Sequence, residues 1–278
     1  MEPPAHYPPD PHLLRDLRLA VGTGADDAAA ELPLCAEVLH AAGSVRAGVV
    51  GVLVDVGGAG PALGAVRPDW LATRDLSLQL LRPVASGTLR AHARLLQAGR
   101  QTAVIEVEIR GGADARLVAM ASASFARMPA RTEYQRGASR ANHPTSRGRE
   151  LGLPGSRLTR PVLEQIGARL LDASAGALEV ALCSYVVNSL GAVQGGVLAL
   201  LADAACEAAA ASAAGEPRVC TDLSLRYLRL GRTGPFRSAA RVLRASADAA
   251  LVAVEIRDAG RGGELVTAAQ GLATRPLA

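Results

Sequence analysis

Two aspartates stand at equivalent places in two long apolar segments of the chain. Asp55 lies within residues 49–63 and Asp203 within residues 194–213. A carboxylate in an apolar helix loses hydration, so its charged form is costly unless it is paired or takes part in chemistry. Burial also raises the pKa of a carboxyl group towards the range of a general base. We therefore take both as candidate catalytic bases, and a structural Asp bonded to a neighbouring strand is the alternative.

A glycine pair, Gly195-Gly196, opens the second apolar segment directly after Gln194. The first N–H groups of a helix have no partner within the helix, and the helix dipole there favours an anion. Such N–H groups can form an oxyanion hole for a tetrahedral intermediate. Two glycines can also serve close packing alone. Because Asn188 precedes the pair and Asp203 follows it, the combination favours the oxyanion hole.

The same pattern occurs earlier in the chain at a constant offset of 148 residues. The turn before the first apolar segment runs from His40 through Arg46 and Ala47 to Gly48. The residue pairs identical at this offset are Leu34/Leu182, Cys35/Cys183, Val38/Val186, Gly43/Gly191, Val45/Val193, Gly48/Gly196, Val49/Val197, Leu53/Leu201 and Asp55/Asp203. So many matches over so short a stretch indicate an internal duplication.

Each half repeats one order of predicted elements, which is a strand, a long apolar helix and then strands with alternating apolar residues joined by short turns. The helix is apolar on nearly every side, so it must be covered on nearly every side. An antiparallel sheet curved around it meets this need. The sequence therefore predicts an α+β protein of two tandem domains, each an antiparallel sheet wrapped around one long central helix.

The domain boundaries follow from composition. Residues 1–12 hold most of a proline-rich stretch and are expected to be a disordered arm. Residues 13–128 form the predicted N-terminal domain. Residues 129–156 are rich in Arg, Ser, Gly and Pro and are expected to be a linker. Residues 157–278 form the predicted C-terminal domain.

Composition narrows the classes of partner. With 49% hydrophobic residues the chain can bury two cores, and with 3% aromatics it lacks stacking platforms for single-stranded nucleic acid. A net charge of +4 from dispersed Arg suits a small polyanion better than a duplex. The four cysteines show no metal-ligand spacing. We find no signal peptide and no apolar run free enough of charge to span a membrane. These features predict a cytoplasmic protein that binds no nucleic acid, membrane or metal.

The spacing of these residues resembles the PaaI-like branch of the hotdog acyl-CoA thioesterases. That branch has an Asn, a His-Gly-Gly turn six residues later, and an Asp or Glu nine residues after the His. Asn188, Gln194 and Asp203 keep this spacing, as do His40, Arg46 and Asp55. In this chain Gln194 and Arg46 replace the family His.

Two further positions depart from the family pattern. His40 replaces the family Asn, and Ala47 replaces the first Gly of the turn. The family also places a Ser or Thr on the strand after the helix. Thr73 matches it, whereas in the second half Cys220 stands there, with Thr221 one residue further on.

The resemblance implies that two hotdogs pair and that each site draws on both. One site would then bring Asn188, Gln194, Gly195 and Gly196 to Asp55 and Thr73. The other would bring His40, Arg46, Ala47 and Gly48 to Asp203, with Cys220 or Thr221. We expect the first to be the active one, because Arg46 near a carboxylate would lower its pKa and weaken it as a base.

The implied activity is hydrolysis of an acyl-CoA thioester by water that Asp55 activates, with no cofactor other than the CoA of the substrate. The alternative is a non-catalytic hotdog that binds acyl-CoA or regulates. A hotdog dehydratase ranks last, because no His lies near either Asp in the motif. The open edges of hotdog sheets tend to be covered by partners, so we expect a homodimer of tandem hotdogs.

Overall fold

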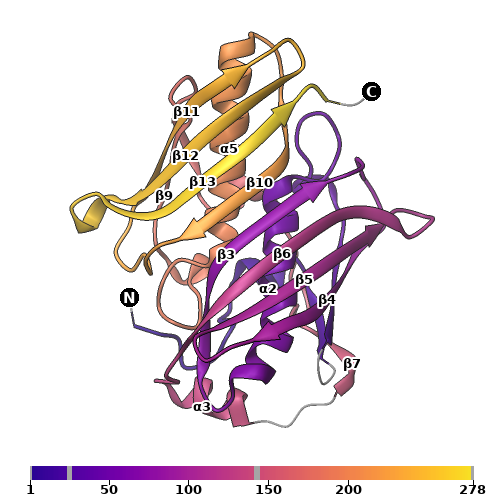
Figure 1. Ribbon diagram of the computed structural model, residues 1–278, viewed down its shortest axis with the longest axis vertical. Helices are drawn as coiled ribbons and strands as arrows, with labels where there is room; N and C mark the ends of the chain where they lie inside the picture. Colours follow the sequence, from indigo (N-terminus) through magenta and orange to yellow (C-terminus); the bar gives the residue numbers. More distant parts are fainter. Residues whose placement is uncertain (1, 24–26, 141–144, 277–278) are drawn as a thin grey trace.

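The computed structural model describes residues 2–23, 27–140 and 145–276, and it consists of two similar halves (Figure 1). In each half an antiparallel sheet curves around one long helix, which is α2 in the first half and α5 in the second. The prediction of two tandem hotdog-like domains is confirmed.

The first half and the segment that follows it contain eleven helices and strands among the described residues. Their bounds, in chain order, are α1 Leu13–Asp16, β1 Ala20–Thr23, β2 Asp27–Pro33, η1 Ala36–Val38, α2 Ala47–Val66, β3 Trp70–Leu80, β4 Thr88–Ala98, β5 Thr102–Gly111, β6 Arg116–Met128, α3 Glu133–Arg140 and β7 Thr145–Glu150. The second half repeats the order strand, 3-10 turn, long helix and meander. Its bounds are α4 Val162–Gln165, β8 Arg169–Asp172, β9 Ala177–Val180, η2 Ser184–Val186, α5 Gly195–Ala214, β10 Val219–Tyr227, β11 Phe236–Ala245, β12 Ala249–Asp258, η3 Ala259–Arg261 and β13 Glu264–Thr274.

One continuous sheet joins the halves, with the strand order β7-β1-β2-β4-β5-β6-β3-β10-β13-β12-β11-β9-β8. The junction is the antiparallel pair β3 and β10, where Ser77 lies opposite Ser224. Figure 1 shows these two strands side by side at the boundary between the halves. This pairing gives each half the other as its partner, so the tandem chain is arranged as a covalent pair of domains.

The two central helices cross closely because each has a glycine at the contact. A Cβ on Gly48 would lie 2.6 Å from the Cα of Leu200, and one on Gly196 would lie 2.8 Å from the Cα of Val52. Only glycine allows backbones to approach this far. The helices run in opposite directions here, so the start of each lies beside the second and third turns of the other. This crossing places the aspartate of each helix at the N-terminus of its partner.

Two segments are more ordered than their composition indicates. Residues 2–12 were expected to be a disordered arm, yet His12 is fully buried and the arm packs on the body of the protein. The expected linker at 129–156 contains α3, and it also contains β7, which pairs with β1. In both segments a few long-range contacts, rather than an apolar pattern, provide the order.

Both central helices are long and apolar enough to cross a membrane by length and composition, which the sequence analysis did not expect. They are core helices, and 67% of the most apolar window of each is buried inside the protein. The chain therefore uses these apolar segments to fill the two halves of its own core.

Candidate active site

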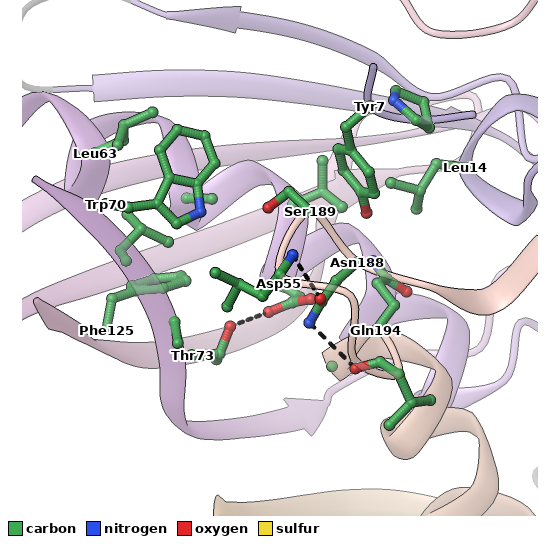
Figure 2. Close-up of a pocket in the computed structure, with 18 of the residues that line it drawn as sticks. Tyr7, Leu14, Asp55, Leu63, Trp70, Thr73, Phe125, Asn188, Ser189 and Gln194 are labelled. Carbon is green, nitrogen blue, oxygen red and sulfur yellow. Dashed lines mark hydrogen bonds between the residues drawn. The ribbon is translucent and has the colours of Figure 1, made fainter. Parts of the chain in front are cut away.

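Asp55 lies at the N-terminus of the opposite helix, as the paired arrangement requires. Its side chain is buried on α2, two turns from the start of that helix. The hydroxyl of Thr73, on β3, donates a hydrogen bond to Oδ1 of Asp55 at 2.5 Å (Figure 2). The backbone N–H of Gly196, in the first turn of α5, donates to the same carboxylate. The structure thus brings Asp55, Thr73 and the glycine turn together from both halves.

The environment of Asp55 shifts its pKa in the direction that suits a base. Burial raises the pKa of Asp55 above its ordinary value, and the hydrogen bonds from Thr73 and Gly196 act against this rise. Because the hydrogen bonds stabilise the carboxylate while burial destabilises it, the group is held ready to accept a proton.

Gly195 leaves one face of the carboxylate open. A Cβ at this position would lie 3.0 Å from Oδ2 and 3.2 Å from Oδ1 of Asp55. Any other residue would therefore fill the space directly against the carboxylate. The equivalent residue in the other half is Ala47. Only the Asp55 site keeps room at this point for a reactant.

Asn188 shapes the turn before α5 rather than bonding Asp55. Its Oδ1 accepts hydrogen bonds from the N–H groups of Leu190 and Ala192, at 2.9 and 3.0 Å, and its Nδ2 donates to the carbonyl of Val193 at 3.2 Å. Three bonds to one short loop fix the path of the chain into α5. Asn188 also lines the cavity beside Asp55, so it positions the helix N-terminus at the site.

Gln194 is the N-cap residue of α5, and its side chain makes no capping hydrogen bond. Only 3% of the residue is exposed, and its Oε1 has no hydrogen-bond partner among the residues the structure describes. A buried amide atom without a partner is costly. Because Gln194 lines the cavity, this amide is available to bind a polar atom of a ligand.

A cavity of about 320 Å³ surrounds these groups. It is lined by Asp55 and Thr73 from the first half and by Asn188, Gln194 and Gly195 from the second. Its walls are mostly apolar and include five of the seven aromatic residues of the chain, namely Tyr7, Trp70, Phe125, Tyr134 and Tyr227. A concave apolar space with a few converging polar groups is typical of a ligand site.

Sequence reasoning missed these aromatic residues. Tyr227 donates a hydrogen bond to the carbonyl of Gly195 at 3.0 Å and so braces the glycine turn. Tyr7 comes from the arm, and Tyr134 comes from the expected linker. The sequence offered one indication of them, which is that aromatic residues are scarce in this chain. In such a chain, each aromatic residue marks a position where a large ring is needed.

The second predicted site is closed by a buried ion pair. Arg46 donates from Nε to Oδ2 of Asp203 at 2.9 Å, and its Nη2 pairs with Glu207, which sequence analysis did not single out. Asp203 is fully buried, and the N–H of Gly48 bonds it as Gly196 bonds Asp55. Arg46 therefore occupies the carboxylate that a reactant would need.

Arg46 acts to lower the pKa of Asp203, in the expected direction, but burial raises that pKa by more, so the net shift is upward. Burial raises the pKa of Asp203 and of Glu207, and Arg46 acts against the rise without reversing it. In turn, the two carboxylates raise the pKa of Arg46 despite its burial, so the guanidinium stays charged. One buried cation is thus shared between two carboxyl groups.

The other residues predicted for the second site serve different contacts. His40 accepts a hydrogen bond at Nδ1 from the N–H of Ala42, so it replaces Asn188 as the residue that shapes the turn. The hydroxyl of Thr221 donates to the carbonyl of Leu272, and the thiol of Cys220 donates to the carbonyl of Asp222. Within the described ranges, neither side chain forms a hydrogen bond with Asp203.

A second cavity, of about 340 Å³, occupies the place that the repeat relates to the first. His40, Val45 and Cys220 line it, at the positions equivalent to Asn188, Val193 and Thr73, and Thr221 lines it as well. Among the described residues that line it, Asp203 and Arg46 do not occur. The hollow persists in this half, but the carboxylate of Asp203 does not line it.

Within the described part of the chain, no group of three or more His, Cys, Asp or Glu side chains is arranged to hold a metal ion.

Family models match both halves of the chain. Residues 40–126 match the acyl-CoA thioesterase N-terminal domain, and residues 190–264 match the thioesterase superfamily. Together the matched residues make up more than half of the chain. A comparison with curated protein sequences finds no match.

Solved structures with the same fold extend over nearly the whole chain. The tesB protein of Mycobacterium avium subsp. paratuberculosis is 16% identical, with a TM-score of 0.65 over 94% of this chain and 96% of that one. A candidate thioesterase II from Thermobifida fusca is 16% identical, with a TM-score of 0.62 over 95% and 98%. A protein with a hot dog fold from Alicyclobacillus acidocaldarius is 11% identical, with a TM-score of 0.58 over 95% and 97%. At these identities the likeness establishes the fold.

Proposed function

Since this chain belongs to the thioesterase superfamily and is a thioester hydrolase, we propose that it cleaves acyl-CoA thioesters at the site around Asp55. The observation that carries this assignment is the open face of the Asp55 carboxylate beside Gly195. On this proposal the attacking water lies at that face, and the thioester carbonyl enters from the cavity that Asp55 and Gly195 both line. The equivalent space beside Asp203 is taken by Arg46.

In the first chemical step, Asp55 takes a proton from water as the oxygen of that water attacks the thioester carbonyl carbon. The C=O electron pair moves onto the carbonyl oxygen. This oxyanion is stabilised by the dipole of α5 and by the N–H of Gly195, since the N–H of Gly196 already bonds Asp55. The unpartnered Oε1 of Gln194 is an acceptor, so it suits a donor such as the attacking water and not the oxyanion.

In the second step, the carbonyl re-forms and the carbon–sulfur bond breaks. The electron pair of that bond leaves with sulfur, and the proton held by Asp55 passes to the thiolate. The products are a carboxylic acid and the free thiol, and the carboxylate of Asp55 is regenerated. Thr73 keeps Asp55 oriented throughout, because its hydroxyl bonds Oδ1 and leaves Oδ2 towards Gly195.

The CoA carrier fits the charge at the cavity. Arg149 and Arg229 line it, and both are exposed, with Arg229 also paired to Glu264. Guanidinium groups near the opening suit the phosphates of a nucleotide tail. The apolar and aromatic walls suit the acyl group.

A non-catalytic acyl-CoA-binding protein remains the second candidate, because Gln194 stands where the family has His. A dehydratase is disfavoured, since no histidine is among the described residues that line the cavity with Asp55. Binding without turnover is therefore the outcome that the experiment must separate from hydrolysis.

The test compares two substitutions at equivalent positions of the repeat. Release of thiol from acyl-CoA esters of several chain lengths is followed with a thiol reagent for the wild type, Asp55→Asn and Asp203→Asn. Loss of the base should lower kcat roughly 10²–10⁴-fold in Asp55→Asn. Asp203→Asn should keep most of the activity, because Asp203 does not line this cavity.

Two results would redirect the assignment. An inactive, folded Asp203→Asn protein would mean that the site is assembled in the opposite sense. If the wild type binds acyl-CoA but releases no thiol from any ester, the binding protein is the correct alternative.

A further inference from the structure

Two segments outside the repeat cover the cavity that contains Asp55. These are residues 7–12 of the N-terminal arm, and α3 together with Arg149 and Leu151. Both cross from the first half to the turn around Asn188 in the second half. We call the two together the cover.

The arm is fixed by buried hydrogen bonds. The ring of His12 donates from Nε2 to the carbonyl of Val187 at 2.8 Å and accepts at Nδ1 from the N–H of Leu14 at 3.1 Å. Arg15 donates to the carbonyls of Pro8 and Pro9, at 2.5 and 2.7 Å, so the chain before His12 is also fixed. Because its ring must offer one donor and one acceptor, His12 sits here as neutral imidazole.

The rest of the cover is fixed in the same way. Gln135 is 1% exposed, and its Nε2 donates to the carbonyl of Ser189 at 2.8 Å. Its Oε1 accepts from the N–H of Arg131 at 2.8 Å, so the start of α3 is also held. Arg15 further donates to the carbonyl of Leu151 at 2.9 Å and so joins the two parts of the cover.

The cover presents aromatic rings to the cavity. The ring of Tyr7 lies 5.4 Å from that of His12 and 6.3 Å from that of Tyr134, and Tyr134 lies 6.1 Å from Trp70. All these contacts are edge-on or nearly so, which is a favourable geometry for rings. In Figure 2 the hydroxyl of Tyr7 points towards Asn188 and Asp55. Tyr7 is therefore a fixed wall of the space in which an acyl group would lie.

The second cavity has no counterpart of this wall. The lining of that cavity includes no aromatic residue among those described, and the chain has one N-terminal arm and one segment between the domains. The repeat would place position 155 as the equivalent of Tyr7, and this is an exposed glycine. The cover is thus an addition to the hotdog pair that acts on the Asp55 site alone.

We propose that Tyr7 is a specificity-determining residue, whose ring closes one side of the acyl cavity and limits the length of the acyl chain that the site accepts. This inference rests on the proposed acyl-CoA hydrolysis for its substrate class. The limit is steric, since a ring held by the contacts to His12 and Tyr134 cannot turn aside without breaking them. One methylene too many in such a pocket changes discrimination by about 10–200-fold.

The test measures kcat/KM for CoA esters of increasing acyl length with the wild type, Tyr7→Ala and Tyr7→Phe. Removing the ring should shift the preferred acyl chain to a longer one and raise kcat/KM for long relative to short esters at least about 10-fold. Tyr7→Phe keeps the ring and should keep the wild-type profile. Binding of non-hydrolysable S-alkyl-CoA thioethers of the same lengths is measured in parallel.

Tyr185→Ala is the matched control. Its ring lies 6.5 Å from that of His12, its hydroxyl donates to Asp16 at 2.9 Å, and it does not line the cavity. It removes a ring from the same cluster without enlarging the cavity, so the length profile should not change.

The outcomes separate this inference from the proposed function. A folded Tyr7→Ala protein with the wild-type length profile in both assays would overturn the role of Tyr7, and so would an equal shift in Tyr185→Ala. If the wild type hydrolyses no ester, the proposed function fails. The thioether profile then decides the role of Tyr7 by itself, with a shift to longer chains supporting it and no shift overturning it.

Discussion

Replacing Arg46 by Gln should destabilise the protein strongly without inactivating the site at Asp55. Arg46 is the single cation between Asp203 and Glu207, and the exposed fractions of the three side chains are 9%, 0% and 14%. Removing one partner of a buried ion pair costs about 3–5 kcal/mol, because the remaining charge loses its compensation. Here two carboxylates would remain, so we expect the upper part of that range.

The loss should be visible in denaturation. At about 2–4 °C per kcal/mol for a chain of this size, the melting temperature should fall by about 6–20 °C. Urea denaturation at pH 8 gives the free energy of unfolding directly. Activity per folded molecule should stay near the wild type, because Arg46 does not line the cavity that contains Asp55.

The loss should also depend on pH in a defined direction. Without the guanidinium, burial still raises the pKa of Asp203 and of Glu207, and the lowering by Arg46 is lost, so both pKa values rise further above the ordinary value. A carboxyl group with a raised pKa in the folded state binds its proton more tightly than in the unfolded state. The free energy of unfolding therefore falls as pH rises above the unfolded pKa. The destabilisation should be smaller at pH 5 than at pH 8.

Two controls make the reasoning refutable. Arg237→Gln removes an arginine that is 56% exposed and bonds Glu179, so it should cost less than about 1 kcal/mol. Adding Asp203→Asn and Glu207→Gln to Arg46→Gln removes both buried charges and should restore much of the stability. An Arg46→Gln protein as stable as the wild type at pH 8, or a triple variant no more stable than the single one, would show that the ion pair does not act as described.

Two further predictions follow from contacts already described. In Thr73→Val, Asp55 loses the hydroxyl bond that lowers its pKa, so the acidic limb of the kcat/KM profile should move to higher pH; an unmoved limb would contradict the contact. We also propose that two chains associate. Exposed leucines support this, namely Leu170 and Leu171 on the edge strand β8 and the paired Leu251 and Leu272. Sedimentation at micromolar concentration should show a dimer, and monomer alone would contradict the proposal.

The arrangement around Asp55 could be predicted because it follows from the internal repeat of the sequence. An offset that aligns Asp55 with Asp203 also aligns Gly48 with Gly196, and these two glycines permit the helices to cross. The pairing that brings Thr73 and Gly195 to Asp55 came from the family resemblance, and the structure brings the same residues together. Their catalytic roles remain predictions.

The cover could not be predicted in the same way. Tyr7 lies in a proline-rich stretch and α3 lies in a polar one, and neither has a periodic apolar pattern. Their order comes from bonds over large sequence separations, such as His12 to Val187 and Gln135 to Ser189. A single sequence gives no sign of such bonds. Glu207 was missed for a related reason, since only the fold brings it to the guanidinium of Arg46.

The two aspartates have different surroundings although few residues around them differ. Asp55 and Asp203 hold equivalent positions, and each accepts a bond from the glycine N–H of the opposite helix. What differs is the residue before the turn. Gln194 leaves the Asp55 carboxylate without a counter-ion, whereas Arg46 supplies one to Asp203.

The Arg46 ion pair stabilises the contact between the two central helices. The helix that begins after Arg46 is the helix that carries Asp55, and the buried pair ties its start to α5. Arg46 does not line the cavity that contains Asp55, so its loss should lower the stability of the whole core without changing that cavity. When the Arg46→Gln protein is heated, we therefore expect hydrolysis to be lost together with global unfolding and not before it.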